Sequence, residues 1–437
     1  MNVFTTSIDI KSELSRLISP KRAWAFARKA GFVLRKGKLN PMIFLWTLAL
    51  GFASGKVRCV SSLRCEYELA SGTVLKPSSF YERFTPALVK YLRLSVTHLI
   101  KAVVGSTVSL SGTLAHFQDL MIADATVLRL YEFLASSFPG VRTNHSKAAA
   151  KLHVVMSATG VNPHTIALTS GRKHEVKKLK IGPWVRLKLL LLDLGYFSFH
   201  LFDRISRNGG YFISRMKTNA DPLITKEFRR CRGRSIKMVG RRLRDVLPGL
   251  KRKTFDVEIA VEFRKRSYSG KQSVKTRKYR LVAVWNELTQ KHHLYITNVP
   301  PEKLSAQDIA LAYKARWEVE LLFKAWKSQF RLDNLPSANK HVVEALIYAS
   351  VITMLVSRKL LILMKQTAAP NIARRFTDGR IAVIVRRLAQ LLLILVTTAP
   401  TKLAQVFRKN VCTLLFHEAI SPHIKRPTLL ETAFGIL

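Results

Sequence analysis

The sequence predicts an α/β fold in which a mixed β-sheet, interrupted by a β-rich insertion, is flanked by helical N-terminal and C-terminal domains. Two observations support this prediction. Helical patterns fill both ends of the chain, and apolar runs typical of buried strands alternate with helical patterns between them. With 437 residues, the chain is long enough for two or three domains and a sizeable core.

Residues 1–105 are expected to form the helical N-terminal domain. Ser19-Pro20 is typical of a helix start, because serine caps a helix and proline fits its first turn. Residues 61–84 contain two helical patterns around a Ser-Gly turn, which is compatible with a helix-turn-helix. The apolar stretch 39–55 is too interrupted to span a bilayer and is expected to be a buried core helix.

Residues 106–335 are expected to form the sheet domain. Strands are predicted at 151–160, 164–171 and 210–217, and two further apolar runs end at Asp124 and Asp193. The insertion, at about 220–300, begins with a densely basic stretch and continues as three alternating strands. A helix is predicted from Ser305 to Phe330. Residues 336–437 form the predicted helical C-terminal domain, in which the short apolar stretch 345–357 reads as core.

The charge is strongly unbalanced. Lys and Arg number 73 against 27 Asp and Glu, which gives a net charge of +46. These positive charges repel one another in the folded protein unless a polyanion neutralises them. Nucleic acid is the first candidate for this polyanion, with an anionic membrane surface or ribosomal RNA as the alternatives. The four cysteines are far apart and form no CxxC pair, so buried free thiols in a reducing cytosol are expected and not a zinc site. The N-terminus does not resemble a signal peptide.

Asp124 and Asp193 share a sequence context, since each ends a buried apolar run. A carboxylate at the end of a buried strand is costly unless it is paired or binds a cation. Strand carboxyl ends are also where ligand sites form in open α/β sheets. Either aspartate alone is explained as well by capping of a turn or a helix. The two together, in a chain with so few acids, favour a site.

Glu320 is the third candidate. On a helix, Tyr313, Arg316, Glu320 and Lys327 fall within roughly a 60° arc of one face. The simple alternative is a solvated stripe of charge pairs. Three converging carboxylates would suit Mg²⁺, which proteins typically hold with one or two carboxylates and substrate phosphate oxygens. Two such ions about 4 Å apart can stabilise both the attacking and the leaving oxygen of a phosphoryl transfer. The sequence therefore predicts metal-dependent phosphodiester chemistry.

The spacing Tyr313-x2-Arg316-x3-Glu320-x6-Lys327 matches the Y-R-E-K signature of bacterial insertion-sequence transposases of the insertion-sequence-four type. The chain resembles this DDE transposase family over about residues 110–345. Asp124, in DAT, resembles the family's first DDE aspartate. Asp193, in DLGYF, resembles the second, and SRMKTNA resembles the strand that follows it. The resemblance implies an RNase H-like core, and the long interval before the glutamate fits the family's β-rich insertion.

The resemblance implies a cut-and-paste DNA transposase. Its N-terminal domain would bind the terminal inverted repeats of the element, and two protomers would pair the ends as a homodimer in a synaptic complex, with the C-terminal domain as a candidate for dimerisation. Asp124, Asp193 and Glu320 would hold two Mg²⁺ ions, for which Mn²⁺ can substitute. The partners would be double-stranded transposon ends and target DNA. No membrane is expected, and the location would be the bacterial cytoplasm, in association with the nucleoid.

Several further residues are expected to bind DNA. Tyr313, Arg316 and Lys327 would contact phosphates near the cleavage point, and Arg215 and Lys217 are candidates for further phosphate contacts. The basic insertion, residues 226–281, would follow the DNA backbone.

In a well-known member of the family, a tryptophan seven residues before a proline stacks on a flipped base. The same offset from Pro300 gives His293 here, and Trp285 is another aromatic residue nearby.

Two other functions fit part of the sequence. A domesticated DNA-binding protein without catalysis would share the charge and the fold, although the complete set of acids argues against it. A structural RNA-binding protein would explain the charge but not the three carboxylates.

Overall fold

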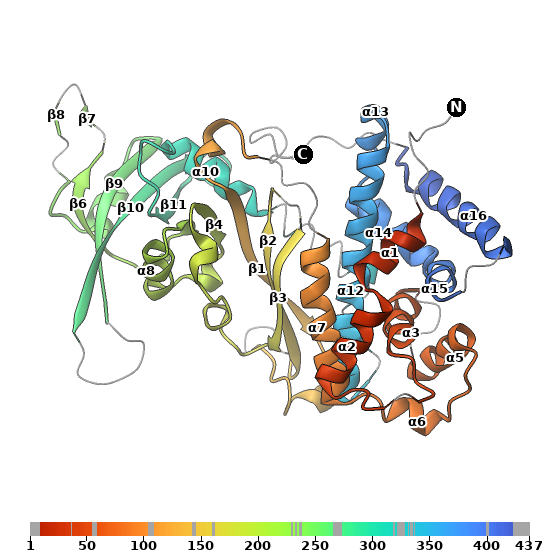
Figure 1. The fold of residues 1–437 in the computed structure, drawn as a ribbon. Helices are drawn as coiled ribbons and strands as arrows, with labels where there is room; N and C mark the ends of the chain where they lie inside the picture. The colour runs from red at the N-terminus through yellow and green to blue at the C-terminus, as the bar shows by residue number, and fades with distance from the viewer. Residues whose placement is uncertain are drawn as a thin grey trace.

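The computed structural model describes residues 9–35, 37–54, 59–103, 109–141, 146–159, 162–228, 230–231, 234–235, 238–264, 273–317, 320, 328–330, 332, 335, 337–398 and 402–422. A large β-sheet occupies one end of the molecule and a group of helices the other (Figure 1). Helices from both termini of the chain belong to this helical end. The predicted α/β class with a mixed sheet is confirmed.

The first five strands of the sheet lie in the order β3-β2-β1-β4-β5. Strands β1, β2 and β3 pair antiparallel, whereas β4 pairs parallel with both β1 and β5. Helix α8 follows β4 and leads into β5. The bounds of these elements are β1 (Asp119–Arg129), β2 (Ala149–Ser157), β3 (Asn162–Ser170), β4 (Lys188–Leu192), α8 (Phe199–Arg207) and β5 (Tyr211–Arg215).

The insertion extends this sheet instead of forming a separate one. Strand β11 pairs antiparallel with β5, and β10, β9 and β6 follow in order, so that one sheet of nine strands results. A small hairpin, β7 with β8, and the short helix α9 complete the insertion. The bounds are β6 (Leu223–Glu227), β7 (Arg230–Cys231), β8 (Arg234–Ser235), α9 (Leu243–Val246), β9 (Thr254–Arg264), β10 (Val274–Asn286) and β11 (Lys291–Thr297).

Two buried charges form ion pairs in this region, one between α8 and the insertion and one within the insertion. Asp203, on α8, is 3% exposed and binds Lys275 at 2.8 Å and Arg277 at 2.7 Å, both on β10. Arg280, further along β10, is 4% exposed and forms a two-pronged ion pair with Asp256 on β9. Burying these charges is tolerable because each is paired and hydrogen-bonded.

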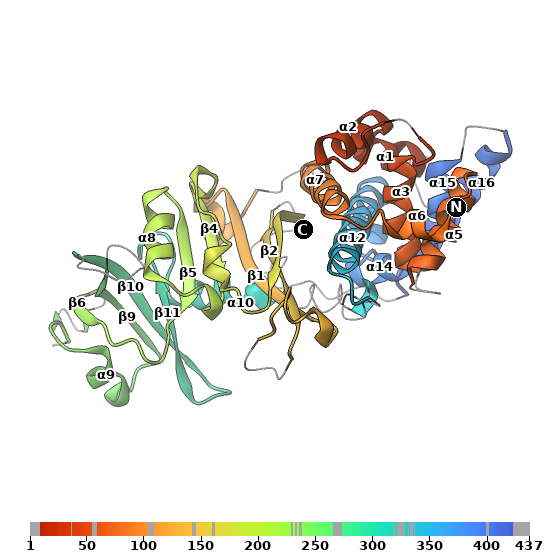
Figure 2. The same cartoon turned by 90° about the horizontal axis from the view of Figure 1, so that it is seen from below.

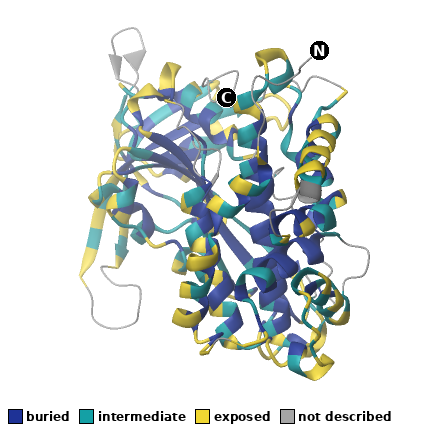
Figure 3. Ribbon diagram, turned by 45° about the vertical axis from the view of Figure 1, so that its right-hand side comes forward, coloured by how far each residue is buried: buried dark blue, intermediate teal, exposed yellow. Residues whose placement is uncertain are grey.

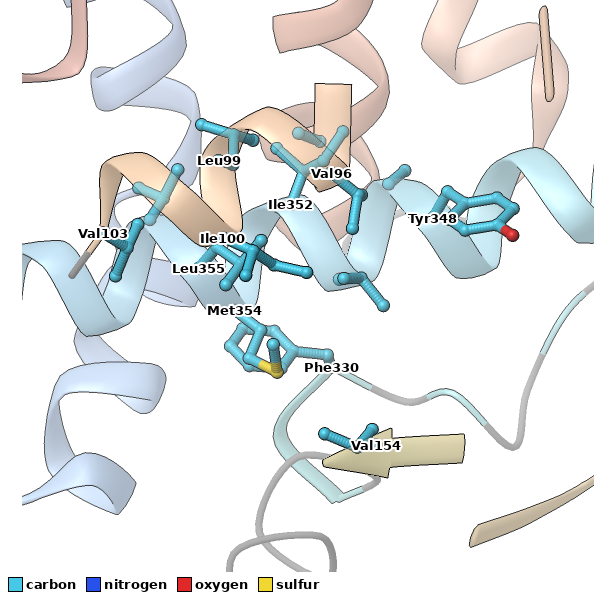
Figure 4. Packing of buried hydrophobic residues seen from close by; sticks show 14 of the residues in the cluster. Val96, Leu99, Ile100, Val103, Val154, Phe330, Tyr348, Ile352, Met354 and Leu355 are labelled. Carbon is cyan, nitrogen blue, oxygen red and sulfur yellow. The ribbon is translucent and has the colours of Figure 1, made fainter. Parts of the chain in front are cut away.

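The helical end is built from both ends of the chain. Helix α7 packs along α12, and the π-helical turn η1 also contacts α12 (Figure 2). Figure 4 shows α7 side chains such as Val96 and Ile100 beside α12 side chains such as Ile352 and Leu355, all in one apolar cluster. The N-terminal bounds are α1 (Ile10–Leu17), α2 (Pro20–Ala30), α3 (Pro41–Trp46), η1 (Thr47–Gly51), α4 (Phe52–Ser54), α5 (Val60–Ser71), α6 (Pro77–Tyr81) and α7 (Pro86–Ala102). The C-terminal bounds are α12 (Lys340–Thr367), α13 (Pro370–Ala373), α14 (Asp378–Arg387), α15 (Ala389–Thr397) and α16 (Lys402–Ala419).

Helix α12 is long and apolar enough to cross a membrane by length and composition, yet 83% of its most apolar window is buried inside the protein. It packs against α7 and α14. Figure 3 shows this helical interior and the central strands as the buried regions of the fold, with exposed residues at the outer helices and loops. The expected core helix in this region is therefore confirmed.

The two faces of the sheet carry different cores, because side chains alternate along each strand. Leu120, Ile122 and Leu191 face the cluster shared with the helical end. Met121 and Leu190 face the second cluster, together with α8. Helix α10 (Ala306–Lys314) lies on the first face, since its Ile309, Ala312 and Tyr313 belong to that cluster.

Candidate active site

Strand register brings the two aspartates side by side. The parallel pairing of β1 with β4 ends at Ala123 opposite Leu192, so Asp124 and Asp193 are the next residues of their chains. Both share the side-chain alternation of Ile122 and therefore point to the face covered by α10. This register brings the two aspartates to one place on the sheet, as the sequence predicted.

One part of the sequence prediction for Asp124 was wrong. Asp124 does not end its strand, because β1 continues to Arg129 and Asp124 pairs with Val154 of β2. The strand continues because β2 still accompanies it after β4 has turned away. Asp193, by contrast, directly follows the last residue of β4, as predicted, and stands at the N-terminal end of the short 3-10 turn η7 (Leu194–Tyr196).

Glu320 reaches the site from the segment that follows α10. Ser305 and Asp308 form a capping box that starts this helix, and α10 ends at Lys314. Arg316 and Glu320 are again helical, and an ion pair of 3.5 Å joins them across one turn. The structure therefore contains the start of the helix predicted for 305–330, followed by further helical residues; residues 318–319 and 321–327, including Lys327, lie outside the described part of the chain.

The three carboxylates gather around one guanidinium group. Nη1 of Arg316 lies 3.5 Å from Oδ2 of Asp124, and Nη2 lies 3.9 Å from Oδ1 of Asp193 and 3.5 Å from Oε2 of Glu320. These distances exceed the roughly 2.7–2.9 Å of charge-assisted hydrogen bonds. The guanidinium therefore attracts all three acids while leaving their oxygens without tight hydrogen bonds to it.

Arg316 also has unused hydrogen-bonding capacity. Its Nε is buried and has no acceptor among the described residues. The guanidinium carbon lies 5.7 Å from the centre of the Tyr313 ring, so that the group is held between an aromatic face and the carboxylates. A buried donor without an acceptor is costly, and an anionic oxygen of a ligand would relieve that cost.

Asp124 is the most buried of the three acids, with its side chain 14% exposed. This burial raises the pKa of Asp124 to about 6, while a hydrogen bond from the Ala125 N–H and the charge of Arg316 act in the opposite direction. The neighbouring Asp193 and Glu320 also raise this pKa. Burial and the neighbouring negative charges destabilise the ionised form of Asp124, and an additional cation nearby would stabilise it.

The donor set fits a hard divalent cation. Carboxylate oxygens are the ligands that Mg²⁺ and similar ions prefer, and here three of them surround a single positive charge. Among the described residues, no three Asp, Glu, His or Cys groups are close enough to hold one ion as they stand. In this arrangement the guanidinium of Arg316 occupies the place between the three acids.

Tyr313 was expected to contact DNA, but its hydroxyl is directed into the protein. The residue is 8% exposed, and its hydroxyl donates a hydrogen bond of 3.3 Å to the carbonyl oxygen of Leu192. Its ring packs against Tyr295, with ring centres 5.3 Å apart. Burial raises the pKa of Tyr313 to about 12, so the hydroxyl stays protonated as a donor.

Arg215 and His293 lie on the same face of the sheet as the acids. Arg215 is the last residue of β5 and pairs with Tyr295, two residues beyond His293 on β11. Burial lowers the pKa of His293, and the charges of Arg215 and Lys314 lower it further, which places these three groups near one another. Trp285 does not pack against His293; its ring packs against His292, with ring centres 4.9 Å apart.

Lys217 lies beyond the end of β5, where its ammonium group stands 5.2 Å from the centre of the Phe197 ring. Phe197 directly follows the turn that carries Asp193. Lys217 is therefore close to this turn, and its side chain is exposed.

Sequence reasoning missed Tyr196. Its side chain is 2% exposed, and its hydroxyl donates a hydrogen bond of 3.3 Å to the carbonyl oxygen of Asp124. The signal that could have revealed it is its position three residues after Asp193, since a turn beginning there returns the chain toward the neighbouring strand.

Comparisons with known proteins identify the family of the chain. Residues 115–356 match the family described as the transposase DDE domain, which covers more than half of the chain. The transposase of insertion sequence element IS231B of Bacillus thuringiensis subsp. berliner is 27% identical over 402 residues, which cover 80% of each protein. That of IS1151 of Clostridium perfringens is 23% identical and covers 76% of each.

Among solved structures, a piggyBac transposase synaptic complex with hairpin DNA aligns with a TM-score of 0.47 and 9% identity, over 97% of this chain and 87% of that one, a likeness too low to argue from. The family model, by contrast, matches more than half of the chain. This match and the relatives show that the chain belongs to the insertion-sequence DDE transposases. The members of this family are metal-dependent enzymes that act on DNA.

Proposed function

We propose that this transposase binds the terminal inverted repeats of its insertion sequence and carries out cut-and-paste transposition with Mg²⁺. The observation that carries the proposal is the gathering of Asp124, Asp193 and Glu320 around Arg316. Glu320 alone would be an ordinary partner of Arg316 one helical turn away, but Asp124 and Asp193 come from other segments and lie at the same guanidinium group, at distances longer than those of tight ion pairs. They suit a site that accepts further positive charge.

The topology supports an RNase H-like catalytic core. The strand order β3-β2-β1-β4-β5, with the first three strands antiparallel and β4 and β5 parallel to β1, is the arrangement that the family resemblance implies. It puts the first acid on β1 and the second directly after the adjacent parallel strand β4, and the helical residue Glu320, which follows the insertion, contributes the third.

Asp124, Asp193 and Glu320 are the residues that would hold two divalent ions. Such ions, when bound, stabilise the attacking and leaving oxygens of phosphodiester cleavage. The residues of the chain itself orient the substrate. Arg316 offers its guanidinium group to a phosphate oxygen beside the acids, and burial of the site strengthens that contact. Water attacks first, and the 3′-OH that it frees becomes the nucleophile for the next strand.

The DNA path proposed here leads away from the acids across basic side chains. Arg215 and His293 lie on the same sheet face as the acids, and Lys217 lies beside the turn of Asp193. Lys327 is included by its place in the Y-R-E-K spacing alone. The net charge of +46 supplies the nonspecific attraction to DNA.

The remaining parts of the chain complete the proposal. The N-terminal helices, within residues 1–105, bind the ends, and α5 and α6, separated by a left-handed Gly72, are the candidate reading unit. Residues 106–335 are the catalytic domain, and residues 336–437 contribute to a homodimer in the synaptic complex. The enzyme works in the bacterial cytoplasm at the nucleoid, and Mn²⁺ can replace Mg²⁺.

The test is cleavage of duplexes that carry the element's own ends. Glu320→Gln should lower Mg²⁺-dependent cutting by more than about a hundredfold, since even an outer partner of a metal ligand is worth about 10–100-fold. Binding of the same duplex should stay within about twofold. Glu132→Gln is the matched control, because Glu132 lies on the surface in an exposed pair with Lys147. Equal cutting by both variants would remove Glu320 from the site.

The second candidate is a DNA-binding protein without catalysis. It predicts that the unchanged protein binds the ends and cuts nothing at any Mg²⁺ or Mn²⁺ concentration, which the same assay detects.

A further inference from the structure

Two buried tyrosines contact the backbone beside the acids. Tyr313, on α10, donates its hydroxyl to the carbonyl of Leu192, the residue before Asp193. Tyr196, in the turn after Asp193, donates its hydroxyl to the carbonyl of Asp124 itself. Both bonds measure 3.3 Å, and both side chains are under 10% exposed.

These bonds lie where the regular sheet pairing stops. The parallel register between β1 and β4 ends at Ala123 and Leu192, one residue before each aspartate. Beyond that point, the hydroxyl of Tyr196 connects the Asp193 turn to β1, and the hydroxyl of Tyr313 connects α10 to β4. The turn of Asp193 is thereby tied to β1, and α10, which leads toward Glu320, is tied to β4.

The turn of Asp193 is also supported from its outer side. A side chain at Gly195 would collide with the carboxylate of Glu175, which forms an ion pair of 3.1 Å with Lys151 on β2. The turn thus fits closely against a charged pair of low exposure. The turn that carries Tyr196 is therefore held by two contacts, the hydrogen bond of Tyr196 to Asp124 and the close approach of Gly195 to Glu175.

We infer that Tyr196 and Tyr313 are positioning residues that set the spacing of Asp124, Asp193 and Glu320 and so determine how well the acids hold divalent ions. The inference rests on the proposed function and adds a role that the Y-R-E-K spacing does not give to Tyr313. A phosphate contact by Tyr313 would act only when DNA is present, whereas positioning of the acids acts with or without DNA.

The test compares three variants that each remove one hydroxyl. Tyr196→Phe and Tyr313→Phe lose one hydrogen bond each and keep their rings. Tyr279→Phe is the matched control, since Tyr279 is 4% exposed and its hydroxyl has no partner among the described residues. Mn²⁺ affinity is measured by electron paramagnetic resonance on the full chain, alone and with duplex end DNA. Cleavage and duplex affinity are measured in parallel.

Tyr196→Phe and Tyr313→Phe should weaken Mn²⁺ binding by about three- to tenfold, the effect expected from one hydrogen bond. The cleavage rate should fall as well, with duplex affinity unchanged. Tyr279→Phe should leave Mn²⁺ affinity as in the unchanged protein. Adding Mn²⁺ should partly restore cleavage by the two positioning variants, which a general loss of folding would not allow.

Two outcomes overturn the inference. Mn²⁺ affinity that is equal in all variants would exclude positioning, and if Tyr313→Phe then weakened only duplex binding, the phosphate contact would be the correct role. An equal loss of Mn²⁺ affinity in all three variants, Tyr279→Phe included, would show a general effect of buried hydroxyls. Failure of the proposed function is distinct, since the unchanged protein would then bind no Mn²⁺, with or without DNA.

Discussion

Arg280 links the insertion to the segment that leads into α10. Its guanidinium group makes bonds of 2.8 and 2.6 Å to the carboxylate of Asp256 and bonds of 3.2 and 2.7 Å to the carbonyls of Val299 and Leu304. The side chain is 4% exposed. Arg280→Met keeps much of the apolar stem but leaves one carboxylate and two carbonyls without this donor.

Removing one member of a buried ion pair costs about 3–5 kcal/mol. Unfolding entropy of about 2.1 cal/mol/K per residue gives roughly 0.9 kcal/mol/K for the whole chain, so the melting temperature should fall by about 3–5 °C. Differential scanning calorimetry measures the shift. Asp256→Leu added to Arg280→Met should recover part of the loss, because it removes the unpaired carboxylate.

Lys278→Met is the control for Arg280→Met. Lys278 lies on the same strand and pairs with Glu258, but its side chain is 63% exposed. A surface pair of this kind contributes about 0–1 kcal/mol, so the melting temperature should move by about 1 °C or less. Equal shifts in the two variants would refute the reasoning that burial makes the Arg280 pair important.

Three further predictions concern single groups. Without metal, Asp124→Asn should become more stable relative to the unchanged protein as the pH rises from about 4 to about 6, since the raised pKa of Asp124 makes its ionisation unfavourable for the folded state; a pH-independent difference in melting temperature would contradict this. Hydrogen bonds from Ser61 and Ser62 lower the pKa of Cys59 to about 7, so its alkylation by iodoacetamide should reach half its maximal rate near pH 7, and Ser61→Ala should move that midpoint upward. Gly140→Ala should lower the melting temperature, because its methyl group would collide with the backbone carbonyl of Ser146, whereas Gly182→Ala, with only an ordinary contact, should not.

The strands were predictable because their patterns are local. The alternation and apolar runs around β2, β3 and β5 identified them nearly to their ends. The sequence did not show that the insertion continues the same sheet, since that depends on β11 pairing with β5 across a long chain interval. It also did not show that α7 packs on α12, because an apolar stripe on a helix does not indicate which other helix it packs against.

Part of the site was predictable for a chemical reason. Carboxylates next to buried strands are expensive, so Asp124 and Asp193 stood out in a chain with few acids. The end of β1 was misjudged because strand length on that side depends on β2. The hydroxyl bonds of Tyr196 and Tyr313 could not be predicted, since they depend on the register between β1 and β4. The position of Arg316 among the acids likewise follows from tertiary packing.

Asp124, Asp193 and Glu320 are proposed to form one metal-dependent unit. The most direct measurement is the Mg²⁺-dependent cleavage rate of end duplexes for Asp124→Asn, Asp193→Asn, Glu320→Gln and the triple variant. Residues that act as a unit give grossly non-additive losses. The triple variant should therefore cut as slowly as each single variant, within about threefold, with duplex binding retained. Losses that multiply from the single variants to the triple variant would show that the three acids act independently and do not form one unit.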